Sequence, residues 1–251
     1  MSMAIVCKSP AELQKMRRAG HVVREVLDAV KAAVAPGVTT MDLEHVAEKK
    51  MQELGGTAAF KGYNGYPCVL CTSLNDEIIH GIPSEKRMLK EGDIISLDFG
   101  AVVDGYYGDS AITVPVGEVK PELKKLMEVT QAALDRAIEK MLIGNTVGDV
   151  GAAVQELVEA NGFSVVREFV GHGIGTRMHE DPQVPNFGLH GRGPRLREGM
   201  VLAIEPMVNA GGPDARVLDD HWTAVTADGS PSAHFEHSVA VTKNGPLVLT
   251  V

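Results

Sequence analysis

The stretch LKEGDIISLD at residues 89–98 returns as LREGMVLAIE at residues 196–205, and this repetition indicates a fold of two similar halves. Each copy begins at a leucine, passes a Glu-Gly pair and ends an apolar run with a carboxylate. The copies are offset by 107 positions (89 to 196, 98 to 205), so Asp98 and Glu205 occupy matching places. A duplicated unit with an acid at the same place in both copies can bring the two acids to one central point. That convergence favours a cluster of metal ions over a lone acid–base catalyst.

The repetition extends on both sides of these stretches. GVTTMD at residues 37–42 is echoed by GNTVGD at residues 144–149, again 107 positions apart. DSAITV, which begins at Asp109, matches EHSVAV, which begins at Glu236, at an offset of 127. The 20 additional positions (127 against 107) fall between Glu205 and Glu236, in a Gly/Pro/Asp-rich stretch that predicts a loop. Chance similarity between amphipathic helices is the alternative, but it does not account for the matched acids.

Each half of the chain is predicted to run helix, helix and then several strands. The first half shows helical stretches over residues 11–35 and in AEKKMQELGG, and the second shows them over residues 121–143 and in VQELVEANG. No Pro/Ser linker or low-complexity segment separates the halves. We therefore expect a single catalytic domain over residues 1–251 with an internal duplication, at about 10–118 and 119–251.

Composition excludes several classes of function. The chain has 251 residues, 44% of them hydrophobic, and a net charge of −9 without a basic stripe, so nucleic-acid binding has no electrostatic footprint. No apolar run approaches the length that spans a membrane, and the N-terminal residues lack the apolar core of a secretory signal. An odd count of three cysteines favours a reducing compartment. We expect a cytoplasmic enzyme that does not contact a membrane.

The first two acids are predicted to share one hairpin. Asp104-Gly105 is a strong two-residue turn signal, and a turn there places Asp98 opposite Ala111 and Asp109 opposite Gly100. Residues two apart on a strand share a face, so both carboxylates project to the same side, close enough to share ions. A β-bulge would spoil this parity, and a solvated sheet face would accommodate both acids without metal.

The remaining candidates lie in apolar surroundings. Glu205 and Glu236 sit within the strand-like runs GMVLAIEPMV and AHFEHSVAV, where a lone ionised glutamate is costly. His172 lies in FVGHGIG at residues 169–175, whose glycines allow a close approach of the backbone; an exposed loop histidine is the alternative. This glycine string lacks the spacing of a nucleotide-binding loop. Four carboxylates and one imidazole suit two ions of Mn(II), Fe(II), Co(II) or Zn(II), roughly 3.5–4 Å apart, that activate a water for hydrolysis of an amide-like bond.

Several short motifs resemble those of the methionine aminopeptidases. The resemblance runs from about residue 8 to the C-terminus and rests on HGIP at 80–83, LDFG at 97–100, GDS at 108–110, GHGIG at 171–175, MHEDP at 178–182 and IEP at 204–206. It implies the pita-bread fold, an α+β fold of two pseudo-symmetric halves, each with helices packed on a curved antiparallel sheet. A dimetal centre lies between the halves of that fold.

The resemblance implies a role for each metal-site residue. Asp98 is expected to bind one ion through both oxygens. Asp109 and Glu236 are expected to bridge the two ions. His172 and Glu205 complete the shell of the other ion, and Glu205 also takes a proton from the bridging water as general base.

The resemblance also implies the residues that hold the substrate. His179 matches a family histidine that contacts the scissile carbonyl, and His80 matches one near the substrate backbone and the leaving amine. An apolar pocket around the methionine side chain is expected at Phe60, Tyr63, Tyr66, Cys71, Met178 and Trp222. Without the family resemblance, the residues favour a packed turn at 63–66 and a core role for the tryptophan.

The expected function is metal-dependent removal of the N-terminal methionine from nascent peptides with a small second residue. The short spacing between His172, Glu205 and Glu236 leaves no room for the helical insertion of type II enzymes, so the type I form is expected. Family analogy adds a monovalent cation near Asn75 and Ser232, a transient contact with the ribosome and a monomeric state.

Two other functions stay open at this point. An X-Pro aminopeptidase or prolidase of the same fold would use the same ligands, although those relatives usually carry a separate N-terminal domain and additional histidines. A pita-bread binding module that has lost catalysis would lack ligands, whereas this chain keeps all five.

Overall fold

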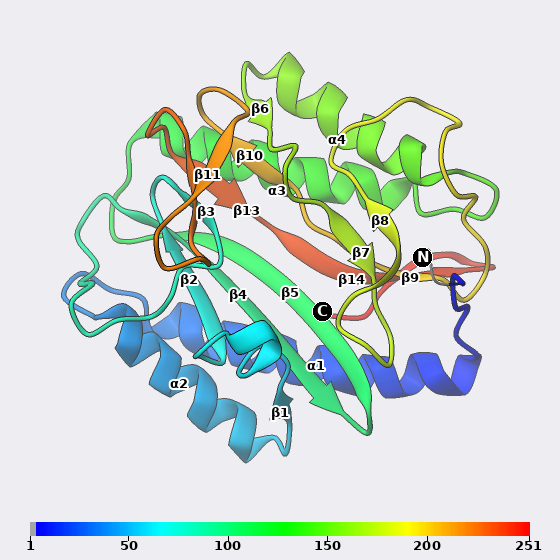
Figure 1. The fold of residues 1–251 in the computed structure, drawn as a ribbon, viewed down its shortest axis with the longest axis horizontal. Coiled ribbons are helices and arrows are strands. Elements are labelled where there is room, and N and C mark those ends of the chain that lie inside the picture. The colour runs from blue at the N-terminus through cyan, green and yellow to red at the C-terminus, as the bar shows by residue number, and fades with distance from the viewer. Residues whose placement is uncertain (1–3) are drawn as a thin grey trace.

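The helices and strands follow the same order in the two halves of the chain (Figure 1). The computed structural model describes residues 4–251. The first half contains α1 (Pro10–Ala33), α2 (Thr40–Glu53), β1 (Thr57–Ala58), the 3-10 turn η1 (Tyr63–Gly65), β2 (Leu70–Leu74), β3 (Glu77–Ile79), β4 (Ile94–Val103) and β5 (Tyr106–Pro115). The second contains α3 (Pro121–Glu139), α4 (Val147–Ala160), β6 (Ser164–Val165), β7 (Gly171–Gly173), β8 (Glu180–Val184), β9 (Val201–Ile204), β10 (Met207–Asn209), β11 (Ala215–Val217), β12 (Ala224–Thr226), β13 (Ser232–His234), β14 (Glu236–Thr242) and β15 (Gly245–Val248).

One curved antiparallel sheet joins the two halves. Its strand order is β1-β4-β5-β14-β9-β7-β8, and β2 and β15 add to β4 and β14 respectively. The central pair, β5 and β14, brings one strand from each half together, with Glu236 opposite Ala111 and His237 opposite Ser110. Two three-stranded sheets, β13-β10-β6 and β11-β12-β3, flank it. The predicted α+β pita-bread architecture of two pseudo-symmetric halves is confirmed.

Local signals fix the helix starts at matching places in both halves. Thr39 and Thr146 cap α2 and α4, each in a capping box with an aspartate three residues later. The same threonines form isolated bridges to Met88 and Arg195, which are again 107 positions apart (195 − 88). The longer helices end two to four residues before the predicted limits, because α1 reaches its C-cap at Val34 and α3 reaches its C-cap at Lys140.

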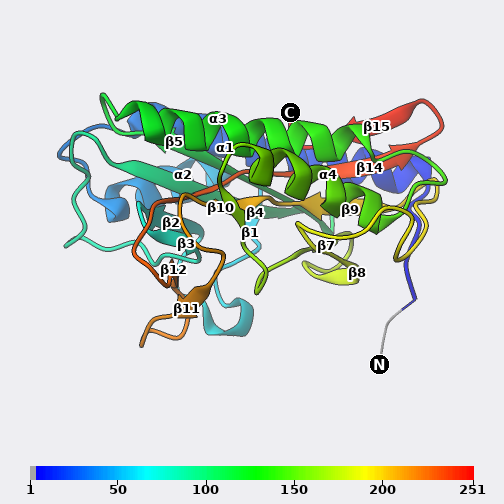
Figure 2. The same cartoon turned by 90° about the horizontal axis from the view of Figure 1, so that it is seen from above.

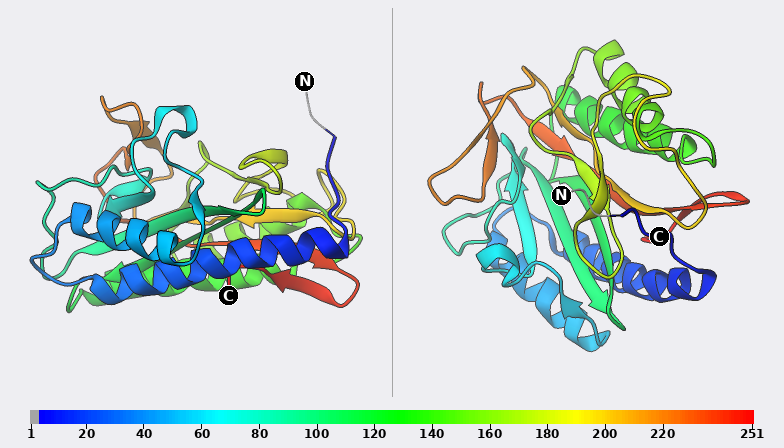
Figure 3. Two further views of the ribbon diagram at one scale, coloured as in Figure 1. Left: turned by 90° about the horizontal axis from the view of Figure 1, so that it is seen from below. Right: turned by 45° about the vertical axis from the view of Figure 1, so that its right-hand side comes forward.

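The helices cover one face of the sheet and leave the other face for the site. Figure 2 and the left view of Figure 3 show α1 and α3 along one side, with η1 and β11 standing on the opposite side. α1 buries a stripe at helical spacing that includes Val23, Val26, Leu27 and Val30, and it packs on β4 and β5. The two largest apolar clusters lie mainly in one half each. Within residues 4–251, no helix is both long and apolar enough to cross a bilayer.

Candidate metal centre and substrate pocket

The hairpin β4–β5 places two acids on one face of the sheet. The turn falls at Asp104-Gly105, where both residues have positive φ, and the register puts Asp98 opposite Ala111 and Asp109 opposite Gly100, as predicted. Pairing is continuous from Ile94 to Val103, so no bulge disturbs the parity of the two acids. Both acids are buried, with 8% of Asp98 and 3% of Asp109 exposed.

The second pair of acids comes from a broken copy of that hairpin. β9 and β10 are separated by Glu205-Pro206, and β13 and β14 are separated by Phe235. The register is the same on both sides of the break, since Ile204 is opposite His237 and Met207 is opposite His234. Glu205 therefore lies opposite Glu236, and β14 carries Glu236 beside β5.

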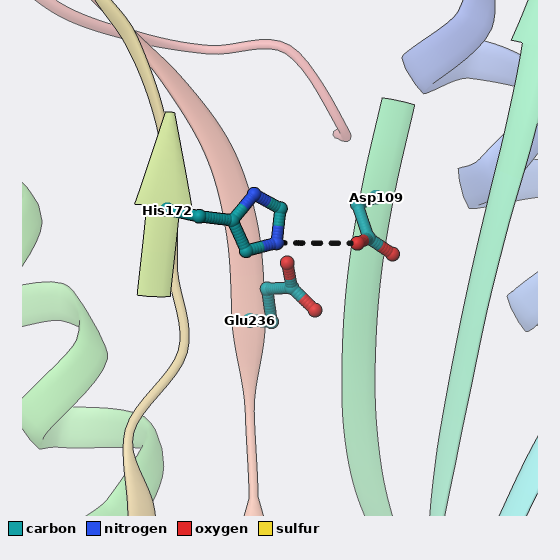
Figure 4. A group of neighbouring side chains, drawn as sticks. All are labelled: Asp109, His172 and Glu236. Atoms are coloured by element: carbon teal, nitrogen blue, oxygen red, sulfur yellow. Dashed lines mark ion pairs between the residues drawn. The ribbon is translucent and has the colours of Figure 1, made fainter. Parts of the chain in front are cut away.

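His172 reaches this cluster from β7, which is held tightly between β8 and β9. A Cβ at Gly171 would lie 2.4 Å from the Ala203 carbonyl oxygen, so only glycine allows this approach. The Nδ1 of His172 lies 3.0 Å from the Gly173 carbonyl oxygen. Its Nε2 is 3.6 Å from Glu205 Oε1. The same nitrogen is 3.9 Å from Asp109 Oδ2, the contact dashed in Figure 4.

Three of the predicted ligands form one compact group. One ligand atom from each of Asp109, His172 and Glu236 lies within 4.8 Å of the others, and Figure 4 shows the three side chains pointing toward one another. The side chain of Glu205 is 12% exposed and adjoins the group through His172. Asp98 is near enough to raise the pKa values of Asp109, Glu205 and Glu236 electrostatically.

The electrostatics of the cluster fit a cation. Burial raises the pKa of Asp98 to about 7, and burial followed by neighbouring carboxylates raises the pKa of Asp109 and Glu236 well above the usual range. Burial and then His179 lower the pKa of His172 to about 3, which keeps the imidazole in the neutral form that binds metals. One oxygen of each of three acids, Asp98, Asp109 and Glu236, is buried without a hydrogen-bond partner among the described residues. Buried carboxylates without partners are costly, and divalent cations would compensate all three.

Two further histidines, His80 and His179, line the same cavity as the metal cluster. His179 is stacked at a tilt on His172, with 4.2 Å between ring centroids, and its Nδ1 is 2.7 Å from the hydroxyl of Tyr63. His80 has a left-handed backbone, with φ of 61°, and its ring meets Trp222 edge-on at 6.1 Å. Burial lowers the pKa of both histidines, to about 4 for His80, so both rings are neutral near pH 7.

One cavity of about 250 Å³ unites every residue that the sequence predicted for the site. The predicted residues that line it are Phe60, Tyr63, Tyr66, Cys71, His80, Asp98, Asp109, His172, Met178, His179, Glu205, Trp222 and Glu236. We call the five predicted metal ligands that line the cavity its floor. The residues Phe60, Tyr63, Tyr66, Cys71, Met178 and Trp222 belong to one apolar cluster, which we call its wall. The cavity is therefore apolar next to a charged floor.

The inserted residues between Glu205 and Glu236 contribute one wall of this cavity. β11 and β12 pair with each other, and β12 pairs with β3 of the first half. Trp222, in the β11–β12 connection, meets the ring of Tyr66 edge-on at 5.1 Å. The predicted loop thus contains a small hairpin that crosses to the other half.

Sequence reasoning missed several residues of the site. Phe169, Val170, Asn64 and Ile79 also line the cavity, and Phe169 meets His80 edge-on at 6.2 Å. His234 is 2% exposed, and neither ring nitrogen has a hydrogen-bond partner among the described residues. Its Nε2 is 3.8 Å from Glu205 Oε2. The alternation of SAHFEHS put His234 on the same face as Glu236, and this signal could have found it.

The residues expected near a monovalent cation are neighbours. The Ser232 amide donates to the Asn75 carbonyl oxygen at 2.8 Å, and Asn75 has a left-handed backbone with φ of 55°. Asn209, opposite Ser232, has a buried amide oxygen without a partner in the described part of the chain.

Known proteins resemble this chain over its whole length. The sequence profile of metallopeptidase family M24 matches residues 14–243. A methionine aminopeptidase of Clostridium acetobutylicum is 50% identical, covering 98% of this chain and 99% of its own. The crystal structure of methionine aminopeptidase from Thermotoga maritima has a TM-score of 0.97 at 47% identity, covering 98% of this chain and 99% of that chain. An X-Pro aminopeptidase from Thermotoga maritima, with a TM-score of 0.77 at 22% identity, shares the fold alone, and this chain covers 62% of it.

The chain therefore belongs to metallopeptidase family M24, an assignment that implies a divalent metal cofactor. Within that family, its full-length identity places it with the methionine aminopeptidases of type I, which are hydrolases that act as metalloexopeptidases. Such enzymes act on peptides. The likeness to X-Pro aminopeptidase extends to the fold and no further.

Proposed function

We propose that the chain removes N-terminal methionine from peptides with a small second residue, using a water activated between two divalent cations. The observation that carries this proposal is a single cavity in which five metal-ligand side chains form the floor and an apolar cluster forms the wall. Cations held by Asp98, Asp109, His172, Glu205 and Glu236 would supply Lewis-acid polarisation and lower the pKa of the attacking water.

The apolar wall is proposed to select the methionine side chain. Tyr66 and Trp222 present aromatic edges, and Met178 and Cys71 add soft, polarisable sulfur. Thioether contacts with aromatic edges stabilise by about 0.3–1.5 kcal/mol each. The Tyr66 hydroxyl donates to backbone carbonyl oxygens of Leu70 and Gly81, so its ring is fixed before substrate arrives.

The chain's own groups are proposed to handle the protons and the developing charge. Glu205 accepts the proton of the attacking water and can deliver it to the leaving amine, which completes the cleavage. His179, held by the Tyr63 hydroxyl through Nδ1, can donate from Nε2 to the oxygen of the scissile carbonyl. His80, whose ring meets those of Phe169 and Trp222 edge-on, is proposed to contact the substrate backbone and the leaving amine. Removing one such donor typically lowers turnover about 10²–10³-fold.

The identity and number of the ions remain part of the proposal, with Co, Mn, Fe and Zn as candidates for the two sites. A monovalent cation near Asn75 and Ser232 belongs to it as well, supported by the buried amide oxygen of Asn209. We also propose a monomer that works in the cytoplasm on nascent chains and contacts the ribosome transiently. The internal duplication at about 10–118 and 119–251, within one catalytic domain, is supported by the matching caps and bridges.

The proposal is tested by stripping the protein of metal and restoring one ion at a time. We expect restored hydrolysis of Met-Ala-Ser, weaker hydrolysis of Met-Leu-Ser and no hydrolysis of Ala-Pro. Binding of two equivalents of metal is expected in titration calorimetry. Cleavage of Ala-Pro alone would favour an X-Pro aminopeptidase, and a failure to bind metal would favour a binding module.

A further inference from the structure

A buried ion pair joins the segment before α1 to the loop that carries two site residues. Lys8 Nζ lies 2.6 Å from Glu180 Oε2, and these side chains are only 3% and 4% exposed. In every other lysine–glutamate pair of residues 4–251, both side chains are at least 30% exposed. Buried ion pairs are weak sources of stability, because desolvation offsets their attraction. Their geometry, however, fixes the groups that they join.

Glu180 closes the loop at residues 174–180. While Oε2 binds the lysine, Oε1 accepts from the backbone amides of Thr176 at 2.9 Å and Arg177 at 3.3 Å. The loop delivers Met178 and His179 into the cavity immediately before Glu180 begins β8. The position of both side chains therefore depends on where Glu180 is held.

Lys8 is in turn anchored to the second half of the molecule. Its backbone amide donates to the Gly199 carbonyl oxygen at 2.7 Å, and its ammonium also donates to the Val6 carbonyl oxygen at 3.2 Å. Its aliphatic stem lies against Gly175, where an added Cβ would come within 2.4 Å of Lys8 Cε. The lysine thus supports the loop from the segment that leads into α1.

We propose that Lys8 and Glu180 are positioning residues for His179 and Met178. The pair fixes the 174–180 loop so that the His179 ring stays 2.7 Å from the Tyr63 hydroxyl and faces the cavity. Neither residue lines the cavity, so both act through the loop. This inference rests on the proposed roles of His179 and Met178. It means that the segment before α1 supports the site through Lys8.

Three variants of the full-length, metal-loaded enzyme test the proposal. Lys8→Met keeps the stem but leaves a buried carboxylate uncompensated. Lys8→Met/Glu180→Gln removes both charges and keeps an acceptor for the two loop amides. Lys8→Met/Glu180→Ala removes the charges and the acceptor together. Lys243→Met, which breaks an exposed pair with Glu198, is the matched control.

The readouts are kcat and KM for Met-Ala-Ser, metal affinity by calorimetry and amide hydrogen exchange at Thr176 and Arg177. We expect Lys8→Met and the alanine double variant to lose about 10–100-fold in kcat, as small misplacements of reacting groups do. Metal affinity should stay within about twofold, because the metal ligands lie on other segments, while exchange of the two amides should quicken about tenfold or more. The glutamine double variant keeps an acceptor for the two amides but loses the ion pair, so its kcat should lie between those of the alanine double variant and the wild type. The control should lie within about twofold of wild type.

Equal kcat and equal amide exchange in the glutamine and alanine double variants would overturn the proposal, even if Lys8→Met alone failed to fold. A lower melting temperature with unchanged kcat and exchange would reduce the pair to a purely structural role. If the wild-type protein hydrolysed no methionyl peptide, the proposed function would be contradicted instead. The exchange rates of the Thr176 and Arg177 amides would still show whether Lys8 and Glu180 hold the loop in place.

Discussion

The two acid-bearing hairpins of the molecule follow the same plan, but only the first is continuous. β4 and β5 pair without interruption around a two-residue turn. Their counterparts are broken at Glu205-Pro206 and at Phe235, and their turn is replaced by residues 210–231. Proline cannot donate to a strand ladder, which accounts for the first break. The first hairpin staggers its two acids, whereas the second sets Glu205 and Glu236 opposite each other.

The two hairpins therefore serve different purposes: the first holds two acids in place, and the second also supplies part of the pocket. The continuous hairpin is a rigid support for Asp98 and Asp109, because each strand is fixed by neighbours on both sides. The broken hairpin gives up some regularity, and its inserted residues cross to β3 and set Trp222 against Tyr66. The plan common to both hairpins thus positions the four candidate acids, and the inserted residues of the second hairpin supply part of the apolar lining.

We expect the largest loss of activity when a carboxylate of the metal cluster is removed, and removing one from each half tests whether the two halves contribute equally to that cluster. Asp109→Asn and Glu236→Gln, at matching positions of the two halves, each replace a carboxylate oxygen that has no hydrogen-bond partner among the described residues. We expect each to lower kcat/KM at least on the order of 10³-fold while leaving the fold intact. Kinetics, circular dichroism and metal titration measure this. Full turnover with two bound ions in either variant would contradict the bridging role.

His179→Ala should have the next largest effect. Loss of a donor to the scissile carbonyl oxygen is expected to lower kcat about 10²–10³-fold with metal occupancy retained. The matched control is His190→Ala, an exposed histidine bound to Asp149 and Glu156, which should change kcat less than about twofold. If the His179→Ala protein bound no metal, His179 would be a metal ligand rather than a substrate-binding residue.

Trp222→Ala tests the wall supplied by the broken hairpin. Removing the indole from against Tyr66 opens the pocket, so kcat/KM for methionyl peptides should fall about tenfold relative to alanyl peptides. Metal affinity should not change, because the tryptophan belongs to the apolar cluster. Leu189→Ala, at an exposed position outside the cavity, serves as the control. If the ratio of kcat/KM between methionyl and alanyl peptides did not change, the inserted residues would have no role in side-chain selectivity.

The metal-free protein should show how much the ionisation of buried Asp98 destabilises the fold. Burial raises the pKa of Asp98 to about 7 in the folded chain, against 3.8 as the ordinary value. The contribution of protonated Asp98 to the free energy of unfolding is therefore fully present below about pH 3.8, and it is lost as the pH rises through 7. In EDTA, Asp98→Asn should therefore gain stability relative to wild type as the pH rises from about 4 to 7, with a melting difference of a few degrees. A difference that does not change across this window would contradict the shifted pKa.

The smallest expected effect compares the repeated helix caps. Thr39→Ala and Thr146→Ala remove equivalent capping boxes from α2 and α4, and each should cost about 0.5–2 kcal/mol of unfolding free energy. Thr146 is buried, so its variant should lie at the upper end. Chemical denaturation measures both, with kcat unchanged in each. A loss confined to one helix would show that the two halves are not energetically alike.

Much of the site could be predicted from the sequence because local signals specified it. The Asp104-Gly105 turn fixed the register of the first hairpin, and alternation then fixed the faces of Asp98 and Asp109. The offset of 107 placed Glu205 in the matching position of the second half. The pocket residues, by contrast, came from family resemblance, since nothing local distinguishes Trp222 from a core anchor.

Other features depended on contacts that no local pattern contains. His234 was missed because its significance comes from its distance to Glu205 rather than from its neighbours in sequence. The pairing of β12 with β3 links segments of different halves, and no periodicity in residues 210–231 indicates it. The ends of α1 and α3 came slightly early because capping geometry, rather than composition, ends a helix.

The residues and their spacing predicted five candidate metal ligands, the similar order of elements in the two halves and the chemistry that five such side chains can support. Turns, caps and strand alternation are local, and the physical interactions that enforce them act over a few residues. The residues and their spacing did not reveal that Lys8 meets Glu180, that Glu205 faces Glu236 or that Trp222 lines the cavity, because these depend on how the folded chain packs. Those contacts join distant segments, and they exist because burial of two apolar cores brings the segments together.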